Sequence, residues 1–412
     1  MRLFNTLSQS IETVQPLDDE VALYVCGITP YDTTHLGHAF INVVYDTLRR
    51  HLLWRGTSVC YVQNVTDIDD DILRKAREVG LTWDALGLRE TERYMRDLTA
   101  LNVLPPTHYV RASAAIEQMV TLISELMAKG LAYERDGWVY YDVSADPGFG
   151  ALAEASGIHG YHELLTTANE RGNFPDDPRK SDPLDFVLWQ AQQPGEPAWP
   201  SPWGAGRPGW HIECSALATR FLGPRVTIHG GGADLIFPHH TCEIAQSEHA
   251  TGVRPFVQVW MHCAMVGLDG EKMSKSLGNL ILAHDLLASY APDAIRLLLL
   301  AHHYRQPWEY LAAEMDAAAT RAARYSAAVH ASDVQEIAQG DDVIAQRAVE
   351  AFGAALDEDL DTPTALAALD MLATASLEAP TPARVAALRE LGGVLGLTYG
   401  DVNPRAAAWT LE

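Results

Sequence analysis

The sequence is poor in lysine and has no long apolar run. Only five lysines occur in 412 residues, and the net charge is −24. A chain this acidic lacks the surplus of Lys and Arg that neutralises phosphates in sequence-independent nucleic-acid binding. No run approaches the roughly 20 apolar residues that span a bilayer, and the N-terminus lacks the layout of a signal peptide. We therefore expect a cytoplasmic protein, with no membrane contact.

Cysteine is also scarce. The five cysteines are Cys26, Cys60, Cys214, Cys242 and Cys263. An odd and sparse set argues against a disulfide framework and favours thiols that act as ligands, catalysts or core residues. Cys60 and Cys263 are most simply explained as buried strand residues.

Alternating strand and helix signals predict an α/β fold. The apolar run at 21–26 predicts a strand, and a segment with helical spacing follows it up to Gly56. The β-rich run 58–65 predicts a second strand, and Thr66-Asp67 are the expected N-cap of a helix that ends at Gly80. Strand, helix, strand and helix with short connections indicate a parallel sheet.

The chain is long enough for two to three domains. We expect a Rossmann-type catalytic domain in two halves, with a connective insertion that begins near a hairpin at Asp136-Gly137. The Ala/Leu-rich remainder predicts an all-α helical bundle. The expected ranges are 1–125 for the first half, 126–205 for the insertion, 206–290 for the second half, 291–325 for a junction and 326–412 for the bundle.

Four residues far apart in the sequence have the chemistry of a zinc site. Cys26 ends a predicted strand, Cys214 lies in GWHIECSA, and His239 and Glu243 are spaced i, i+4 on one helix face. Two thiolates, an imidazole and a carboxylate make a four-ligand zinc site, or a three-ligand site if the carboxylate binds weakly. Cys242 is a competing ligand, and each of these residues taken alone is equally a core residue.

Two short motifs have the chemistry of a polyphosphate site. His35, Gly37 and His38 lie at a predicted helix N-terminus, where backbone N–H groups and the helix dipole attract phosphate. Lys272 and Lys275 lie on a predicted loop with two serines, where they can stabilise a leaving pyrophosphate. The alternatives are a histidine-rich turn and a solvated basic loop.

Together, HLGH (35–38) and KMSKS (272–276) resemble the two signatures of class I aminoacyl-tRNA synthetases. NVTDIDD (64–70), GRPGWHIECSA (206–216), GGGADLIFPHH (230–240) and EIAQSE (243–248) resemble the cysteine branch of that family, over roughly residues 20–310. The resemblance implies a class I synthetase-type Rossmann domain followed by a helical bundle. It also implies a zinc ion that binds the substrate cysteine as a thiolate.

The resemblance carries roles to individual residues. It implies that His35, His38, Lys272 and Lys275 are catalytic, and that one Zn²⁺ per chain is held by Cys26, Cys214, His239 and Glu243, with Mg²⁺ accompanying ATP. Trp210 would pack over the bound side chain, and Asp234 and Thr66 would hold its amine. The implied contacts to cysteine and ATP are Gly27, Ile28, Thr29, Gly37, Asn64, Val65, Thr66, Trp210, Gly232, Ala233, Asp234, Val266, Met273, Ser274 and Ser276.

Two kinds of enzyme share this machinery: cysteinyl-tRNA synthetase and the mycothiol-biosynthesis ligase that joins cysteine to glucosaminyl-inositol. ITPYD (28–32), VLPPTHYV (103–110) and ERGNFPDDP (170–178) resemble the second. Only fifteen residues follow LGGVLGL (391–397), where the tRNA enzyme has a further anticodon-reading domain. Residues 326–412 also hold fourteen acidic residues against four arginines, which disfavours tRNA.

Other features resemble the tRNA enzyme, in particular Glu243 within EIAQSE. Ile41 departs from both, because a threonine is usual there near the nucleotide. We favour a monomeric ligase that uses L-cysteine, ATP and an amino sugar, with tRNA as the alternative acceptor. Another amine acceptor and a non-catalytic synthetase relic are further alternatives. The relic is disfavoured because both motifs and all four expected ligands are present.

Overall fold

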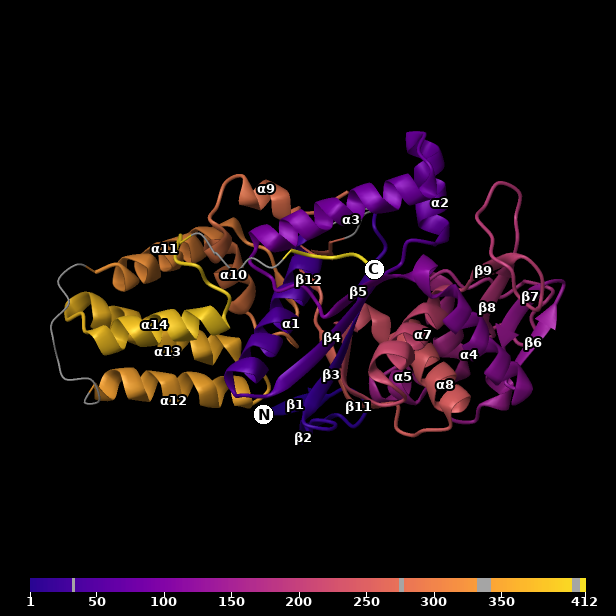
Figure 1. The fold of residues 1–412 in the computed structure, drawn as a ribbon, viewed down its shortest axis with the longest axis horizontal. Helices are drawn as coiled ribbons and strands as arrows, with labels where there is room; N and C mark the ends of the chain where they lie inside the picture. The colour runs from indigo at the N-terminus through magenta and orange to yellow at the C-terminus, as the bar shows by residue number, and fades with distance from the viewer. Residues whose placement is uncertain (32–33, 274–277, 332–341, 402–407) are drawn as a thin grey trace.

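The computed structural model describes residues 1–31, 34–273, 278–331, 342–401 and 408–412. Its centre is a parallel sheet with the strand order β11-β10-β3-β4-β5 (Figure 1). This confirms the predicted α/β fold. The strands are β3 (Glu20–Ile28), β4 (Ser58–Val65), β5 (His108–Arg111), β10 (Val226–Gly232) and β11 (Val257–Cys263).

Alternate residues of β3 pack against opposite layers, as the period of two in a strand requires. Val21, Leu23 and Val25 join the core around α1 (Leu36–Trp54). Tyr24 and Cys26 instead join the core around α7 (Trp210–Leu222). The sheet is therefore covered on both faces, and Cys26 belongs to the α7 side. The other helical segments of this region are α2 (Asp70–Val79), α3 (Trp83–Ala100), η1 (Ala112–Ala115), α4 (Ile116–Ala128), η3 (Ala233–Leu235), η4 (Ile236–His240) and α8 (Thr241–Thr251).

The connective insertion forms its own antiparallel sheet, with the order β6-β7-β8-β9. Asp136 and Gly137 form the predicted hairpin turn, with φ values of 55° and 80°. The sheet continues to Pro208, three residues beyond the expected boundary at 205. Its elements are β6 (Ala132–Arg135), β7 (Trp138–Tyr141), η2 (Val143–Ala145), α5 (Ala151–Ala155), α6 (Gly160–Glu170), β8 (Phe186–Ala191) and β9 (Gly206–Pro208).

Smaller elements complete the part of the chain that precedes the helical bundle. An N-terminal hairpin pairs β1 (Arg2–Asn5) with β2 (Ser10–Thr13), and a small sheet joins β12 (Val266–Leu268), β13 (Glu271–Lys272) and β14 (Trp308–Glu309). The helices α9 (Ala283–Leu287) and α10 (Pro292–Leu300) then lead to the bundle.

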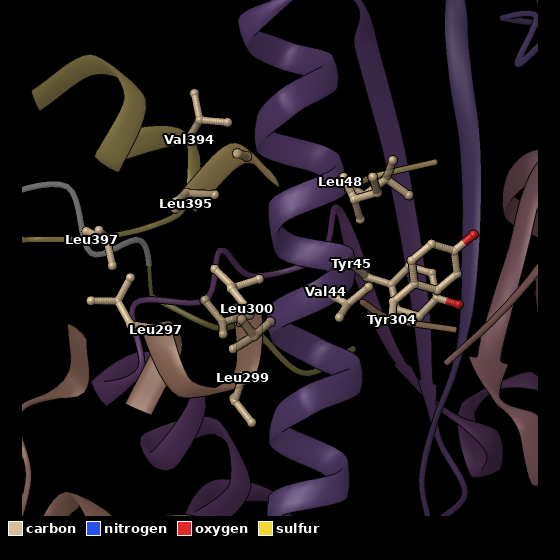
Figure 2. Close-up of a cluster of buried hydrophobic side chains, with 14 of the residues drawn as sticks. Val44, Tyr45, Leu48, Leu297, Leu299, Leu300, Tyr304, Val394, Leu395 and Leu397 are labelled. Atoms are coloured by element: carbon tan, nitrogen blue, oxygen red, sulfur yellow. The ribbon is translucent and has the colours of Figure 1, made fainter. Parts of the chain in front are cut away.

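The C-terminal region is helical, and its helices lie together at one end of the molecule (Figure 1). Figure 2 shows an apolar contact between the end of this region and the part of the chain that precedes it. It includes Val44 and Leu48 of α1, Leu297 and Leu300 of α10, and Leu395 after α14. Among the described residues, no helix combines the length and apolarity needed to cross a membrane. The bundle helices are α11 (Ala312–Val329), α12 (Val343–Asp357), α13 (Thr362–Glu378) and α14 (Pro382–Val394).

The start of α2 differs from the prediction. Its cap is Asp69, whose carboxylate accepts from the Asp71 amide, and not Thr66-Asp67. Thr66 and Asp67 do not cap the helix because contacts with other parts of the chain engage them. The Thr66 amide donates to the Ile28 carbonyl at 2.9 Å, and the Asp67 carboxylate accepts from the Ser113 amide at 2.9 Å. These bonds keep the chain extended past β4, so that both side chains serve other contacts.

Candidate active site

A cavity of about 800 Å³ lies at the carboxyl ends of β3 and β10. Ligands of open parallel sheets bind in this position, because the loops that leave the strands form a crevice there. The lining residues come from the end of β3, the start of α1, η3 and the segment around β12. They include Cys26, Gly27, Ile28, Thr29, His35, Gly37, His38, Ile41, Trp210, Gly232, Asp234, Val266 and Met273.

The predicted metal ligands meet beside this cavity, which Cys26 lines and the other three do not. Cys26, Cys214, His239 and Glu243, which we call the ligand cluster, are all buried, and their ligand atoms lie within 4.8 Å of one another. Cys26 Sγ lies 3.7 Å from Cys214 Sγ and 3.5 Å from Glu243 Oε1. His239 Nε2 lies 3.4 Å from Cys214 Sγ and 3.2 Å from Glu243 Oε1.

These separations fit a tetrahedral metal ion. Bond lengths of 2.0–2.3 Å to nitrogen, oxygen and sulfur place the ligand atoms of a tetrahedral zinc about 3.3–3.8 Å apart, and the measured distances of 3.2–3.7 Å fall in or next to this range. Two sulfurs, an imidazole nitrogen and a carboxylate oxygen are also a donor set that suits zinc. The residues present therefore fit the ion.

Neighbouring histidines orient the cluster. His211 Nδ1 and His239 Nδ1 lie 2.9 Å apart, so a proton shared there leaves His239 Nε2 free to face Cys214. His229 Nε2 lies 2.9 Å from Glu243 Oε2, which leaves Oε1 on the side of His239. Such outer contacts fix the tautomer and the orientation of metal ligands.

A second donor set overlaps with the first. It comprises Cys26, His229, His240 and Glu243, and it shares Cys26 and Glu243 with the ligand cluster. Cys26 Sγ lies 3.3 Å from His240 Nε2. His229 and His240 are fully buried, and of the residues in the two sets Cys26 is the one that lines the cavity. In neither set of the described residues does Cys242 take part.

Burial favours the neutral forms of the two thiols and of the imidazoles. Burial, together with Cys214 and Glu243, raises the pKa of Cys26 well above its usual value, and burial also raises the pKa of Cys214. Burial lowers the pKa of His239 and His240 well below the usual value. Neutral imidazoles have the lone pairs that a metal requires, and a bound cation would displace the thiol protons.

Trp210 and Asp234 both line the cavity, and Trp210 also contacts the ligand cluster. The Trp210 ring stacks on His239 with 4.5 Å between centroids, and 37% of this residue is exposed. Gly232 permits the approach of Asp234, because a Cβ at Gly232 would lie 2.5 Å from its carboxylate. An aromatic face and a carboxylate thus line the cavity, where they suit a side chain and an amine.

The HLGH motif forms another wall of the cavity. The rings of His35 and His38 stack with 3.7 Å between centroids at the N-terminus of α1. The Ile281 carbonyl accepts from the Leu36 amide at 2.8 Å, so the chain just after KMSKS is bound to this motif. Lys272 lies in β13 and Met273 lines the cavity, whereas Ser274, Lys275 and Ser276 lie outside the described residues.

Some expected contacts lie below the cavity wall. Asn64, Val65 and Thr66 are buried at the end of β4, and the Thr66 hydroxyl donates to Glu213 Oε2 at 2.7 Å. Ala233 occupies the turn between Gly232 and Asp234. None of these four lines the cavity, so their contact with substrate remains a prediction.

Sequence reasoning missed other residues of the site. Tyr31, Arg74, Lys75 and Tyr94 also line the cavity. Glu213 was missed although it precedes Cys214. Burial, with a contribution from nearby acidic residues, raises the pKa of Glu213 well above its usual value. The available signal was an acidic residue next to the predicted ligand Cys214. Its partner, Thr66, lies 147 positions away in the sequence, so spacing along the chain does not indicate the contact.

The comparison with protein families identifies the family of this chain. The family described as "tRNA synthetases class I (C) catalytic domain" matches residues 13–320. An L-cysteine:1D-myo-inositol 2-amino-2-deoxy-alpha-D-glucopyranoside ligase from Parafrankia sp. is 45% identical over 98% of this chain and 90% of its own length. The ligase of the same name from Catenulispora acidiphila is 46% identical over 90% and 86%. A cysteine–tRNA ligase from Chromohalobacter salexigens is 46% identical over 97% and 86%.

Solved structures show the same fold at low sequence identity. Methionyl-tRNA synthetase from Mycobacterium tuberculosis, in complex with methionyl-adenylate, has a TM-score of 0.63 and 16% identity, and covers 92% of this chain and 89% of its own. The LeuRS of Agrobacterium radiobacter has a TM-score of 0.61 and 13% identity, and covers 92% and 84%. The chain thus has the class I synthetase fold.

Proposed function

The chain belongs to the family of class I (C) tRNA synthetase catalytic domains, and we propose that it is a ligase that activates L-cysteine with ATP and transfers it to the amine of glucosaminyl-inositol. One observation carries the activation step: Cys26 of the ligand cluster lines the same cavity as His35, Gly37 and His38 of the HLGH motif. The proposed thiol site and the proposed polyphosphate site would therefore be adjacent. The use of ATP and cysteine makes a cytoplasmic location part of the proposal.

Recognition of cysteine would depend on the ligand cluster. Cys26, Cys214, His239 and Glu243 are the residues that would hold Zn²⁺, which when bound would supply a soft Lewis acid that prefers a thiolate to a hydroxyl. Shape alone separates near-isosteric substrates by only about 10²-fold. The Trp210 ring would cover the substrate side chain.

Activation would take place between the cluster and α1. Asp234 would hold the amine, so that the carboxylate points toward the N-terminus of α1. The carboxylate attacks the α-phosphorus of ATP, a carboxyl–phosphate anhydride forms, and pyrophosphate leaves. Gly37 and the stacked imidazoles of His35 and His38 would hold the phosphates, where the helix dipole favours negative charge. Lys272 and Lys275 would neutralise the leaving pyrophosphate, and Mg²⁺ would arrive with ATP.

Transfer would complete the reaction. The acceptor amine attacks the acyl carbon of the anhydride, an amide forms, AMP leaves, and the amine proton passes to solvent. An unprotonated amine needs little help from a general base. The names of the relatives from Parafrankia and Catenulispora support an amino-sugar acceptor, and so does the excess of acidic residues over arginines in 326–412.

The second candidate is a cysteine–tRNA ligase. The relative with that name is as similar to this chain as the amino-sugar ligases are. Glu243 within the ligand cluster also fits it. Activation of cysteine would be identical in the two candidates, and only the acceptor differs.

An acceptor comparison tests the proposal. The zinc-loaded chain receives ATP and labelled cysteine with either glucosaminyl-inositol or total tRNA. We expect label in the amino-sugar product alone. Label in tRNA alone would establish the second candidate. ATP–pyrophosphate exchange without transfer to either would point to another amine, and absence of exchange would overturn the ligase assignment.

A further inference from the structure

A buried chain of hydrogen bonds connects the residues next to the two cysteines of the ligand cluster. The Gly27 amide donates to Asn64 Oδ1 at 2.8 Å. Asn64 Nδ2 donates to Thr66 Oγ1 at 3.1 Å, and Thr66 Oγ1 donates to Glu213 Oε2 at 2.7 Å. Gly27 follows Cys26 and Glu213 precedes Cys214, so this chain links the two backbone segments that carry the thiols. We call Gly27, Asn64, Thr66 and Glu213 the polar bracket.

The backbone amide of Gly27 fixes the direction of the first two bonds in the polar bracket. This amide can only donate, so the side-chain oxygen of Asn64 faces Gly27 and its Nδ2 donates to the Thr66 hydroxyl. The Thr66 hydroxyl in turn is bonded to Glu213 Oε2. Asn64 and Thr66 are each 2% exposed and Glu213 is fully buried. Because no water competes for these groups, loss of one link leaves buried polar atoms without a partner.

A bulge in β3 aims Cys26 at Cys214. Val25 pairs with Gln63 and Ile28 pairs with Val65, so Cys26 and Gly27 together oppose Asn64 alone. Bulges of this kind redirect a side chain beside an active site. A Cβ at Gly27 would lie 1.7 Å from the backbone carbonyl oxygen of Asn64, which restricts this position to glycine. The strand can therefore approach Asn64 closely enough for the first link of the bracket.

The bracket bears on the choice between the two overlapping donor sets. Both contain Cys26 and Glu243; one adds Cys214 and His239, and the other adds His229 and His240. The bracket connects the segment of Cys26 only to the segment of Cys214. We propose that Asn64, Thr66 and Glu213 are positioning residues that hold the two thiols together and so select the two-sulfur donor set over the one-sulfur set. This inference rests on the proposed metal site.

The number of sulfur ligands gives a readout that a purely structural role would not change. The test loads the full chain with Co²⁺ and measures thiolate-to-cobalt charge-transfer absorbance per bound ion, together with zinc affinity by chelator competition. Thr66→Val should reduce the absorbance per ion to about one half, because one thiolate replaces two. It should also weaken zinc binding about 10- to 100-fold, as is typical for loss of an outer contact.

Matched variants separate the bracket from general damage. Thr66→Ser retains the hydroxyl and should restore the wild-type spectrum. Thr47→Val removes an equally buried hydroxyl that bonds within its own helix, to the Val43 carbonyl, and should leave the spectrum unchanged. Asn64→Leu breaks the bracket at another link and should reproduce the effect of Thr66→Val if that variant does not fold.

The outcomes distinguish this inference from the proposed function. If the wild-type chain binds neither Zn²⁺ nor Co²⁺, the proposed metal site is wrong and the bracket has no role in it. If the wild-type chain binds Co²⁺ through two thiolates, and folded Thr66→Val and Asn64→Leu give the same spectrum and affinity, the metal site stands and the bracket inference is overturned.

Discussion

Two polar clusters lie within residues 13–320, the part of the chain that matches the catalytic-domain family. They differ in whether the cluster itself contains charges of both signs. The first is the ligand cluster. The second, which we call the charge node, contains Asp46, Arg50 and Arg296. Arg296 Nη2 lies 2.6 Å from Asp46 Oδ2, and Arg50 Nε lies 2.8 Å from the same oxygen. The remaining guanidinium nitrogens of Arg296 donate to the carbonyls of Leu395 and Leu101 at 2.7 and 2.9 Å.

The comparison separates a structural cluster from a binding site. The charge node contains charges of both signs, and its Arg296 donates to the Leu395 carbonyl at the end of the bundle. The ligand cluster contains thiols, neutral imidazoles and a carboxyl group, and it adjoins a cavity. Burial raises the pKa of its two thiols, so a bound cation would favour their ionisation. We therefore expect changes in the ligand cluster to affect metal and activity, and changes in the charge node to affect stability.

The largest effect is expected from Cys214→Ala. Loss of one thiolate should abolish stoichiometric zinc binding and lower cysteine-dependent ATP–pyrophosphate exchange by about 10³-fold or more, since a bound metal is worth several kcal/mol. Metal analysis and exchange rates on the same preparation check this. Exchange that survives in zinc-free Cys214→Ala would contradict the role of the cluster.

Arg296→Met, in the charge node, should lower the stability of the fold and leave zinc binding unchanged. Removal of Arg296 leaves the buried Asp46 with Arg50 as its counter-charge and leaves the carbonyls of Leu101 and Leu395 without this donor, which costs about 3–5 kcal/mol in total. Zinc per folded chain should not change. The free energy of unfolding in urea measures the loss, and Arg2→Met is the matched control, because its ion pair with Glu358 is half exposed and is worth about 0–1 kcal/mol. Equal losses in the two variants would show that the node is not structural.

As the pH falls, we expect zinc to leave the ligand cluster before the charge node loses its contribution to stability. Burial opposes ionisation of Asp46, but Arg50 and Arg296 hold the pKa of this carboxyl below its usual value. The node therefore contributes stability above the usual carboxyl pKa of about 3.9, and loses it as pH falls through the lower pKa of the folded state. Zinc should leave at higher pH, because burial raises the pKa of both thiols and protons then compete with the metal. A metal-sensitive dye and circular dichroism, followed along one acid titration, report the order. Unfolding before zinc release would contradict it.

The smallest effect is expected from Cys242→Ala. This cysteine is buried next to the ligand Glu243 but belongs to neither donor set. Zinc content and exchange should stay at wild-type values, with a loss of about 1 kcal/mol of stability from the missing sulfur. A drop in zinc content would instead make Cys242 a ligand.

Much of the fold was predictable from the sequence because local signals agree with the tertiary structure. The apolar runs at 21–26 and 58–65 became β3 and β4, and the helix that ends before Gly56 became α1. The cap of α2 was not predictable, because Thr66 is engaged by the Ile28 carbonyl and by Glu213. These contacts arise only after β3, β4 and α7 have come together.

The site was predictable where residue chemistry is distinctive. Cys26, Cys214, His239 and Glu243 were expected and do meet. The adjacent His240 was not expected, although its Nε2 lies 3.3 Å from Cys26 Sγ; the extended dihedral angles of Phe237 within η4 are not indicated by helical spacing along the chain. His229 contacts Glu243 from β10, a pairing across the α7 side of the sheet that spacing along the chain does not indicate.

The most direct test of the account is ATP–pyrophosphate exchange with cysteine or serine, using zinc-loaded and zinc-free protein. The account predicts exchange only with zinc, and a preference for cysteine that exceeds the roughly 10²-fold that shape alone provides. Equal exchange without zinc, or comparable exchange with serine, would contradict the claim that the buried cluster reads the thiol of the substrate through a metal.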